Sequence, residues 1–136
     1  MNVSILEFRC DDYREIKFEY GALEPLGYNL SSLQINNYEL KPQGLVNLTG
    51  STNLRKLLTL DLRYNKISGI DDKAFSGIKF VQQLYLTSSH VKHIAKHSLA
   101  GLNDLVTFCI EGNELTTLQN GSFDNFQNNG KNENKG

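Results

Sequence analysis

Apolar residues recur through the chain at a spacing that fits neither a single helix nor a single strand. Between residues 57 and 70 they stand at intervals of three, two, five and three, with an asparagine in the longest gap: Leu57, Leu60, Leu62, Asn65, Ile67 and Ile70. The series restarts 24 residues later at Val81 and again at Leu105, and units of 27 residues start at Leu30 and Val3. Self-similarity at a period of roughly 20 to 50 residues indicates a repeat protein. Five units, starting at 3, 30, 57, 81 and 105, form one predicted domain over residues 3–126.

Each unit predicts one short strand, a turn and a return segment. In the Leu60-Asp61-Leu62 triplet the two leucines point to one side of a strand and Asp61 points to the other. One unit is too small to bury its own leucines, so neighbouring units are expected to stack and share a continuous core and a parallel sheet. Asn65 and Asn113 suit the turn after the strand, where a side-chain amide can satisfy backbone groups.

The remaining apolar positions complete the expected core. In the first unit they read Val3, Leu6, Phe8, Tyr13 and Ile16. A second apolar pair in each unit closes the opposite wall: Leu23/Leu26, Leu45/Leu48, Phe75/Ile78, Leu99/Leu102 and Phe123/Phe126. Gly77 and Gly101 hold equivalent places, as expected for a turn that leads the chain back to the next strand.

The segment LDLRYNKISGI (60–70), together with AFSGI (74–78) and SLAGL (98–102), resembles the leucine-rich repeat family over about nine-tenths of the chain. Its spacing and period are similar to the typical extracellular subclass of Toll-type receptors, insect immune proteins and neuronal adhesion receptors. The asparagine position departs from the family pattern and reads Asp11, Tyr38, Asn65, Ser89 and Asn113. The resemblance implies an α/β solenoid, a horseshoe with a curved parallel sheet of about five short strands and irregular or short helical returns on its convex side.

Composition and charge narrow the classes of partner. The 136 residues include 14 basic and 15 acidic side chains, a formal charge of −1 scattered along the chain, which gives no reason to expect nucleic acid or an anionic membrane as partner. No apolar run approaches the roughly 20 residues of a membrane span. Charges lie throughout residues 1–20, so this chain shows no signal peptide. Residues 127–136 are polar and rich in asparagine and glycine, and we expect a disordered tail there.

Four sequons point to an extracellular compartment. N-glycosylation acceptors stand at Asn2, Asn29, Asn47 and Asn120, none of them on an outward strand position. Cys10 and Cys109 fall in units one and five. Strands spaced about 4.8 Å apart would separate them by about 20 Å, too far for a disulfide. The predicted ends also lack the covers that solenoids need, which predicts either a piece of a larger ectodomain or a homo-oligomer formed through uncapped ends.

The outward strand positions form the candidate protein-binding surface, the concave sheet face, called the sheet face below. Its predicted binding residues are Glu7, Arg9, Gln34, Asn36, Asp61, Arg63, Tyr64, Tyr85, Thr87 and Glu111. Tyrosine and arginine are enriched where interfaces concentrate binding energy. Tyr64 and Tyr85 lie near the middle of this surface, beside Arg63 and Asp61.

Other residue clusters give weaker signals for chemistry. His90, His93 and His97 read as a zinc site, a pH-responsive cluster or plain surface residues. Cys109 and these histidines belong to opposite walls of the predicted solenoid, so they do not form a nucleophile and base. No glycine-rich phosphate loop or nucleophile elbow is found. We therefore expect no enzyme, no cofactor and no metal.

Two functions follow as expectations. The first is an extracellular protein–protein recognition module, which binds a protein ligand through the sheet face as part of a receptor or a secreted immune or adhesion protein. The second is a structural element that self-associates or docks through its uncapped solenoid ends.

Overall fold

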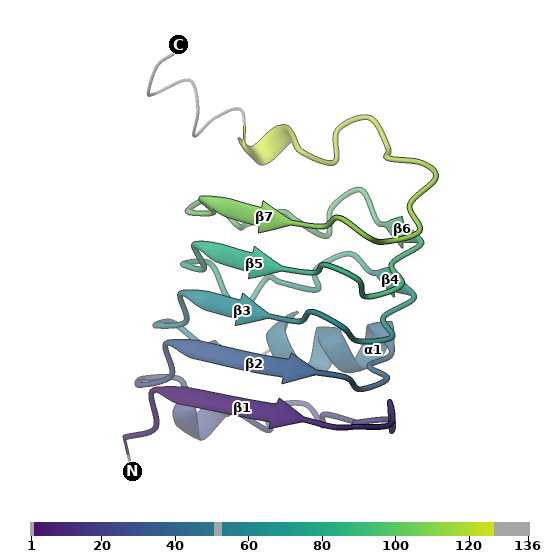
Figure 1. The fold of residues 1–136 in the computed structure, drawn as a ribbon. Helices are drawn as coiled ribbons and strands as arrows, with labels where there is room; N and C mark the ends of the chain where they lie inside the picture. Colours follow the sequence, from purple (N-terminus) through teal and green to yellow (C-terminus); the bar gives the residue numbers. More distant parts are fainter. Residues whose placement is uncertain (1, 51–52, 127–136) are drawn as a thin grey trace.

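The computed structural model describes residues 2–50 and 53–126, and the tail predicted over 127–136 lies outside them. Five parallel strands stack rung over rung in one sheet, in the order β1-β2-β3-β5-β7 (Figure 1). Their bounds are β1 Ile5–Arg9, β2 Ser32–Asn36, β3 Thr59–Asp61, β5 Gln83–Tyr85 and β7 Thr107–Cys109. Each of the five predicted units supplies one strand, two residues after its start. Two short strands, β4 Gly69–Ile70 and β6 His93–Ile94, pair beyond the turns.

The register of the sheet confirms the predicted stacking. One column of paired residues runs through all five strands and points inward: Leu6, Leu33, Leu60, Leu84 and Phe108. The next column points outward and reads Glu7, Gln34, Asp61, Tyr85 and Cys109. A shift of one residue in any strand would turn its leucines to solvent, so burial of one face fixes this register.

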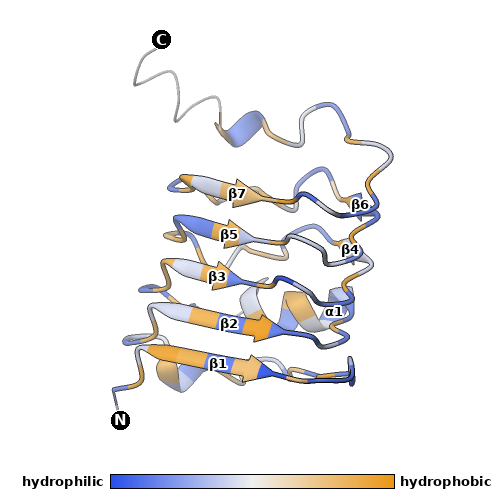
Figure 2. Ribbon diagram, in the orientation of Figure 1, coloured by the Kyte–Doolittle hydropathy of each residue, from blue (hydrophilic) through white to orange (hydrophobic). Residues whose placement is uncertain are grey.

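The inward positions of the middle units are completely buried. Leu33, Leu60 and Leu84 have 0% of their surface exposed, and so does Phe75 on the opposite wall. Figure 2 shows apolar residues along the strands and mostly polar residues in the turns that follow them. Each fully buried leucine contributes about 1.5–3 kcal/mol, and because neighbouring units supply the contacts, that contribution depends on the stack.

A ladder of side-chain hydrogen bonds joins the turns of successive units. The Asn65 Nδ2 group donates to the carbonyl oxygens of Ile35 (2.6 Å) and Leu62 (2.8 Å), and its Oδ1 accepts from the Tyr38 N–H (2.9 Å). Asn113 repeats this pattern two repeats further on, with Nδ2 donating to Leu86 O and Ile110 O. The predicted role of both amides is confirmed.

Residues that replace asparagine keep the ladder connected. The Ser89 hydroxyl donates to Leu62 O at 2.7 Å, the same carbonyl that accepts from Asn65. The Tyr38 hydroxyl reaches back to the Arg9 carbonyl at 3.2 Å. A shorter or differently shaped donor therefore still satisfies a turn carbonyl where the family pattern is lost.

The residue before each ladder position adopts a left-handed backbone conformation. These residues are Asn37, Tyr64, Ser88 and Gly112, with φ of 67°, 66°, 56° and 73°. Asparagine and glycine tolerate this region, whereas tyrosine adopts it at an energetic cost. Tyr64 is thus held in its turn by the surrounding hydrogen bonds. One of them is its own N–H bond to Thr87 O at 3.1 Å.

The return segments are irregular or form short helices, as expected. They include the 3-10 turn η1 Glu24–Leu26, the helix α1 Pro42–Leu45 behind the sheet and the π-helical turn η2 Val46–Gly50. No helix among the described residues has the length and apolar character needed to span a bilayer. Of the two glycines expected at the returning turn, only Gly101 has a positive φ, of 92°.

The core assignment of unit two needs a correction. Leu54, which we did not predict as a core residue, is fully buried three residues before Leu57. Its carbonyl accepts the Leu57 N–H, as the Ile78 carbonyl accepts the Val81 N–H. Leu54 is therefore the equivalent of Ile78. Leu45 and Leu48 are also buried, but they belong to the extra helical turn of this longer unit.

Unit one departs from the prediction in its turn. Tyr13, predicted as a core position, is 36% exposed and lies under the Lys66 ammonium, whose nitrogen is 4.8 Å from the ring centroid. Glu15 bridges Glu39, so the offset between units falls from 27 residues at the strand to 24 after the turn. The turn of unit one is therefore three residues longer. Phe18, which the pattern did not predict, is buried there and packs edge-on against Phe8 at 5.9 Å.

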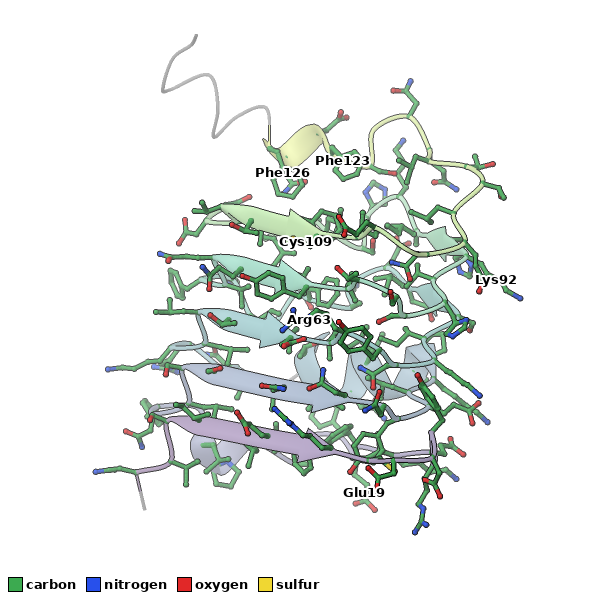
Figure 3. The ribbon with its side chains drawn as sticks, viewed as in Figure 1. Glu19, Arg63, Lys92, Cys109, Phe123 and Phe126 are labelled. Atoms are coloured by element: carbon green, nitrogen blue, oxygen red, sulfur yellow. The ribbon has the colours of Figure 1, made fainter. Side chains whose placement is uncertain are left out.

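The edge strands are less buried than the middle ones. Leu6 and Phe8 on β1 and Phe108 on β7 are half-buried, while their middle-unit counterparts are completely covered. Phe123 and Phe126 lie beyond β7 with ring centroids 6.1 Å apart (Figure 3), and Phe126 packs against the core. The burial of each rung thus depends on having a neighbour on both sides.

The ladder predicts a large stability effect at Asn65. The Asn65→Ala substitution removes the side-chain partner of the Ile35 carbonyl and of the Tyr38 N–H, while the Leu62 carbonyl keeps its bond from Ser89; each lost partner costs about 1–3 kcal/mol. We expect urea denaturation to show a free energy of unfolding lower by about 2 kcal/mol or more. The control Asn53→Ala removes an exposed side chain and should change it by less than about 0.5 kcal/mol. Equal effects at both positions would contradict the ladder's role.

Candidate functional site: the sheet face

The sheet face is built by the outward residues of the five strands and the turns that follow them. The row Glu7, Gln34, Asp61, Tyr85 and Cys109 is in register across the sheet, as predicted. The second predicted row is Arg9, Asn36, Arg63, Thr87 and Glu111, of which Arg9 and Asn36 are paired directly. Backbone hydrogen bonds such as Tyr64 N–H to Thr87 O and Ser88 N–H to Glu111 O continue the rung alignment past the strand ends. The structure therefore brings the predicted residues together on one surface.

Arg63, labelled near the middle of the molecule in Figure 3, forms an ion pair with Asp61 at the centre of this surface. The Arg63 Nη2 group donates to Asp61 Oδ2 at 2.8 Å, and its Nε donates to Oδ1 at 3.0 Å. The Arg63 backbone N–H also donates to Asp61 Oδ1 at 3.0 Å. Two parallel guanidinium bonds to one carboxylate fix the planar group in orientation as well as position.

Two carboxamides from β2 extend this network. The Asn36 Nδ2 group donates to the Arg63 carbonyl at 2.9 Å and to Asp61 Oδ1 at 3.4 Å. The Gln34 Nε2 group in turn donates to Asn36 Oδ1 at 2.5 Å. A continuous chain of hydrogen bonds therefore joins two rungs on the outer side of the sheet, where most of the neighbouring positions are open to solvent.

The charges of this network shift its pKa values. Burial alone would raise the pKa of Asp61, but the hydrogen bonds and charge of Arg63, with a smaller contribution from Asn36, outweigh burial and leave that pKa lowered. The hydrogen bond to Asp61 raises the pKa of Arg63 above its ordinary value. Both groups thus stay ionised, and the ion pair persists at neutral pH.

Aromatic side chains flank the ion pair. The Arg63 guanidinium carbon lies 5.2 Å from the centroid of the Tyr85 ring, within cation–π range. Tyr64, in the following turn, is 48% exposed. The centre of the sheet face therefore presents an arginine and two tyrosines, with the arginine held in place by Asp61.

Two predicted binding residues are covered instead of exposed. Asp61 has 6% of its surface exposed and Asn36 has 7%. The neighbouring side chains of Arg63 and Gln34 account for this, because they are hydrogen-bonded to them. Asp61 and Asn36 are positioning residues in this arrangement, and a ligand would touch Arg63, Tyr64 and Tyr85.

A hollow opens beside this centre, near the ends of β1 to β3. Its volume is about 330 Å³, and it is lined by Arg9, Gln34, Asn36, Asn37, Arg63 and Tyr64. Asn37, one residue past the end of β2, was not among the predicted binding residues, although Tyr64 at the equivalent turn position was. The signal that could have indicated it is its equivalence to Tyr64, one repeat earlier.

The cysteines and histidines, which were the other candidates for chemistry, do not form a cluster. Cys10 and Cys109 are both free thiols and lie at the opposite edge strands, as the spacing predicted; the Cys10 thiol donates to Asp12 at 3.0 Å. The three histidines are exposed, and His90 pairs with Glu114 at 2.9 Å. Within residues 2–50 and 53–126, no group of three His, Cys, Asp or Glu side chains is placed to hold a metal ion.

The four sequons lie outside the sheet face but differ in exposure. Asn2 and Asn120 are exposed, and Asn29 is half-buried. Asn47 has structural contacts: its Nδ2 donates to the Phe18 carbonyl and its Oδ1 accepts from Gln43, each at 3.0 Å. The sequence pattern alone treats these four sites as equal, and the structure separates Asn47 from the others.

Comparison with known proteins agrees with this geometry. No curated protein matches the chain in a sequence search. A family model described as leucine rich repeat matches residues 28–91, which span β2, β3 and β5, the turns after them and the returns of the first two. Domains of this family typically serve as scaffolds for protein–protein interaction. Five strands in register, one per repeat, and this match across the central units together support a leucine-rich repeat family for the chain.

Proposed function

We propose that the protein is an extracellular recognition module that binds a protein ligand through its sheet face. The observation that supports this most strongly is the fixed Arg63 side chain between Asp61 and Tyr85. Arginine and tyrosine are the residue types most enriched among the dominant contacts of interfaces. A side chain already held in one conformation loses less entropy on binding, so its contacts contribute more to affinity.

The compartment is inferred from the sequons. Asn2, Asn29 and Asn120 are at least partly exposed, and all lie outside the strands. Glycans at these positions would leave the sheet face open to a ligand. This distribution supports an ectodomain or secreted protein of the receptor, immune or adhesion type that the family resemblance implies.

Self-association through the edge strands is the second candidate. Phe8 and Phe108 are half-buried on β1 and β7, and an edge strand presents unpaired backbone groups to another chain. This function requires a stable dimer or larger assembly. Light scattering over a range of protein concentrations distinguishes it from ligand recognition, because a monomer at every concentration would contradict it.

The sheet-face proposal predicts that ligand capture depends on Tyr85. A photo-crosslinking residue in place of Tyr85 should attach the ligand from extracellular medium or cell surfaces, and the purified ligand should then bind Tyr85→Ala at least about tenfold more weakly, a loss of about 1.4 kcal/mol. The double variant Asp61→Asn/Arg63→Gln should weaken binding similarly, since it removes both charges of the pair together. Affinity is measured by calorimetry.

Tyr28 supplies the matched control. It also lies under an arginine, with the Arg55 guanidinium carbon 4.5 Å from its ring centroid, but in the return between β1 and β2. Tyr28→Ala should leave the affinity unchanged. If Tyr28→Ala weakened binding as much as Tyr85→Ala, or if only Tyr28 crosslinked, the ligand would bind elsewhere and the proposal would be wrong.

The Asp61–Arg63 pair predicts a defined pH dependence of stability. A carboxyl whose pKa is lowered on folding stabilises the protein above its unfolded-state pKa, and this contribution is lost as the pH falls through the native pKa. The difference in free energy of unfolding between the wild type and Asp61→Asn should therefore be constant from about pH 7 to 5 and shrink below about pH 4. Urea denaturation at each pH measures it. A difference independent of pH down to about pH 2 would show that the Asp61 charge contributes no stability.

Glycan mapping tests the compartment. After secretion from a eukaryotic cell, peptide mapping should find glycans at Asn2 and Asn120, whereas Asn47 should be bare because its amide is bonded within the fold. Asn47→Gln should also lower the free energy of unfolding by about 1 kcal/mol, while Asn120→Gln should not. Efficient export with Asn2, Asn29 and Asn120 all unmodified would contradict an extracellular assignment based on the sequons.

A further inference from the structure

The hollow on the sheet face has an uneven chemical lining. Of its six lining residues, two are arginines, three carry carboxamides and one is Tyr64; none is a carboxylate. Its volume of about 330 Å³ lies at the small end of the range for ligand pockets, about 300–1,000 Å³. A site of this size suits one side chain of a larger ligand.

Both arginines retain donors that can face the hollow. The Arg63 guanidinium uses Nε and Nη2 to bind Asp61, and a guanidinium carries five N–H donors, so its Nη1 group is not used in the bonds to Asp61. The Arg9 guanidinium has no hydrogen-bond or ion-pair partner in the part of the chain that the structure describes. Asp61 makes no hydrogen bond to Arg9 in the described part of the chain, and its bonds to Arg63 use only the Nε and Nη2 groups of that guanidinium.

A second hollow lined by charged residues differs from the sheet-face hollow in containing carboxylates. It lies on the flank beyond the strand ends and contains Lys41, Lys66 and Lys92, with Lys92 at the side of the molecule in Figure 3. That hollow also contains two carboxylates of its own, from Glu39 and Glu114, and Glu114 pairs with His90. The flank hollow therefore has carboxylates in its own lining, whereas in the sheet-face hollow Asp61 pairs with Arg63 from outside the lining and the Arg9 guanidinium has no carboxylate partner among the described residues.

We propose that the hollow between Arg9 and Arg63 receives an aspartate or glutamate side chain of the protein ligand. The inference rests on the proposed function and specifies the chemistry of the partner at that surface. The argument is charge complementarity: two guanidinium groups in one row of the sheet face, with Asn36 between them, line the same hollow and match one carboxylate, and such charge-assisted bonds are about twice as strong as neutral ones. The carboxamide of Asn37 and the Tyr64 ring form the remaining wall.

Two peptides that differ only in charge test this site. The probe is acetyl-Gly-Asp-Gly-Glu-Gly-amide, and its control carries Asn and Gln in place of Asp and Glu. NMR titration of the full chain follows the side-chain Nε–Hε signals of its arginines. The acidic peptide should shift the Arg9 and Arg63 signals saturably and more weakly at high salt, and the amide peptide should not. Arg9→Gln should lower the affinity at least fivefold.

Arg55→Gln is the matched control variant. Arg55 lies in the return between β2 and β3, outside the sheet face, and its guanidinium is over the Tyr28 ring. It should leave the peptide affinity unchanged. Equal binding of the amide peptide, an unchanged affinity in Arg9→Gln, or equal shifts at all arginines would each overturn the proposal. So would acetate, at the same carboxylate concentration, if it saturated the same signals with the same affinity. If the acidic peptide did not bind as expected but crosslinking at Tyr85 succeeded, the proposed acidic contact would be wrong and the proposed function would stand.

Discussion

Everything in this structure depends on the contact between one rung and the next. A single unit of 24 or 27 residues cannot cover its own leucines, and the amides of its turn bond to carbonyl groups of the preceding unit as well as to their own. Leu60 is completely buried because β2 and β5 lie on either side of it, and the Leu62 carbonyl accepts hydrogen bonds from Asn65 in its own unit and from Ser89 in the next. Apolar burial and turn hydrogen bonding thus both act between neighbours, so the stack forms cooperatively.

The same constraint produces the candidate site. Fixing the inward leucines fixes the outward residues between them, because side chains alternate along a strand. Residues from different units are thereby brought into contact across the sheet: Asn36 of unit two bonds to Asp61 of unit three, and Arg63 lies over Tyr85 of unit four. The packing of the core therefore also determines which residues meet on the sheet face.

The repeat period is what made the fold and the rows of the sheet face predictable from sequence. A period-two alternation inside a fixed repeat determines which residues share a column, so the column through Leu60 and the row through Asp61 followed directly. The misses lie where the period changes. The longer turn of unit one exposes Tyr13 and buries Phe18, and the extra helical turn of unit two leaves Leu54 to close the wall. Asp61 is covered because the Arg63 side chain packs against it, and the spacing of residues in the sequence does not predict that side-chain conformation.

The Asp61–Arg63–Asn36 network also limits how this surface can change over evolutionary time. Outward residues outside this network, such as Thr87 and Glu111, have no side-chain partner in the described part of the chain, so a mutation at one of them leaves the scaffold intact. The central three residues are interdependent, and losing one strands a charge or a carboxamide of the others. New specificities should therefore accumulate at the periphery of the face first, with the middle inherited as a unit.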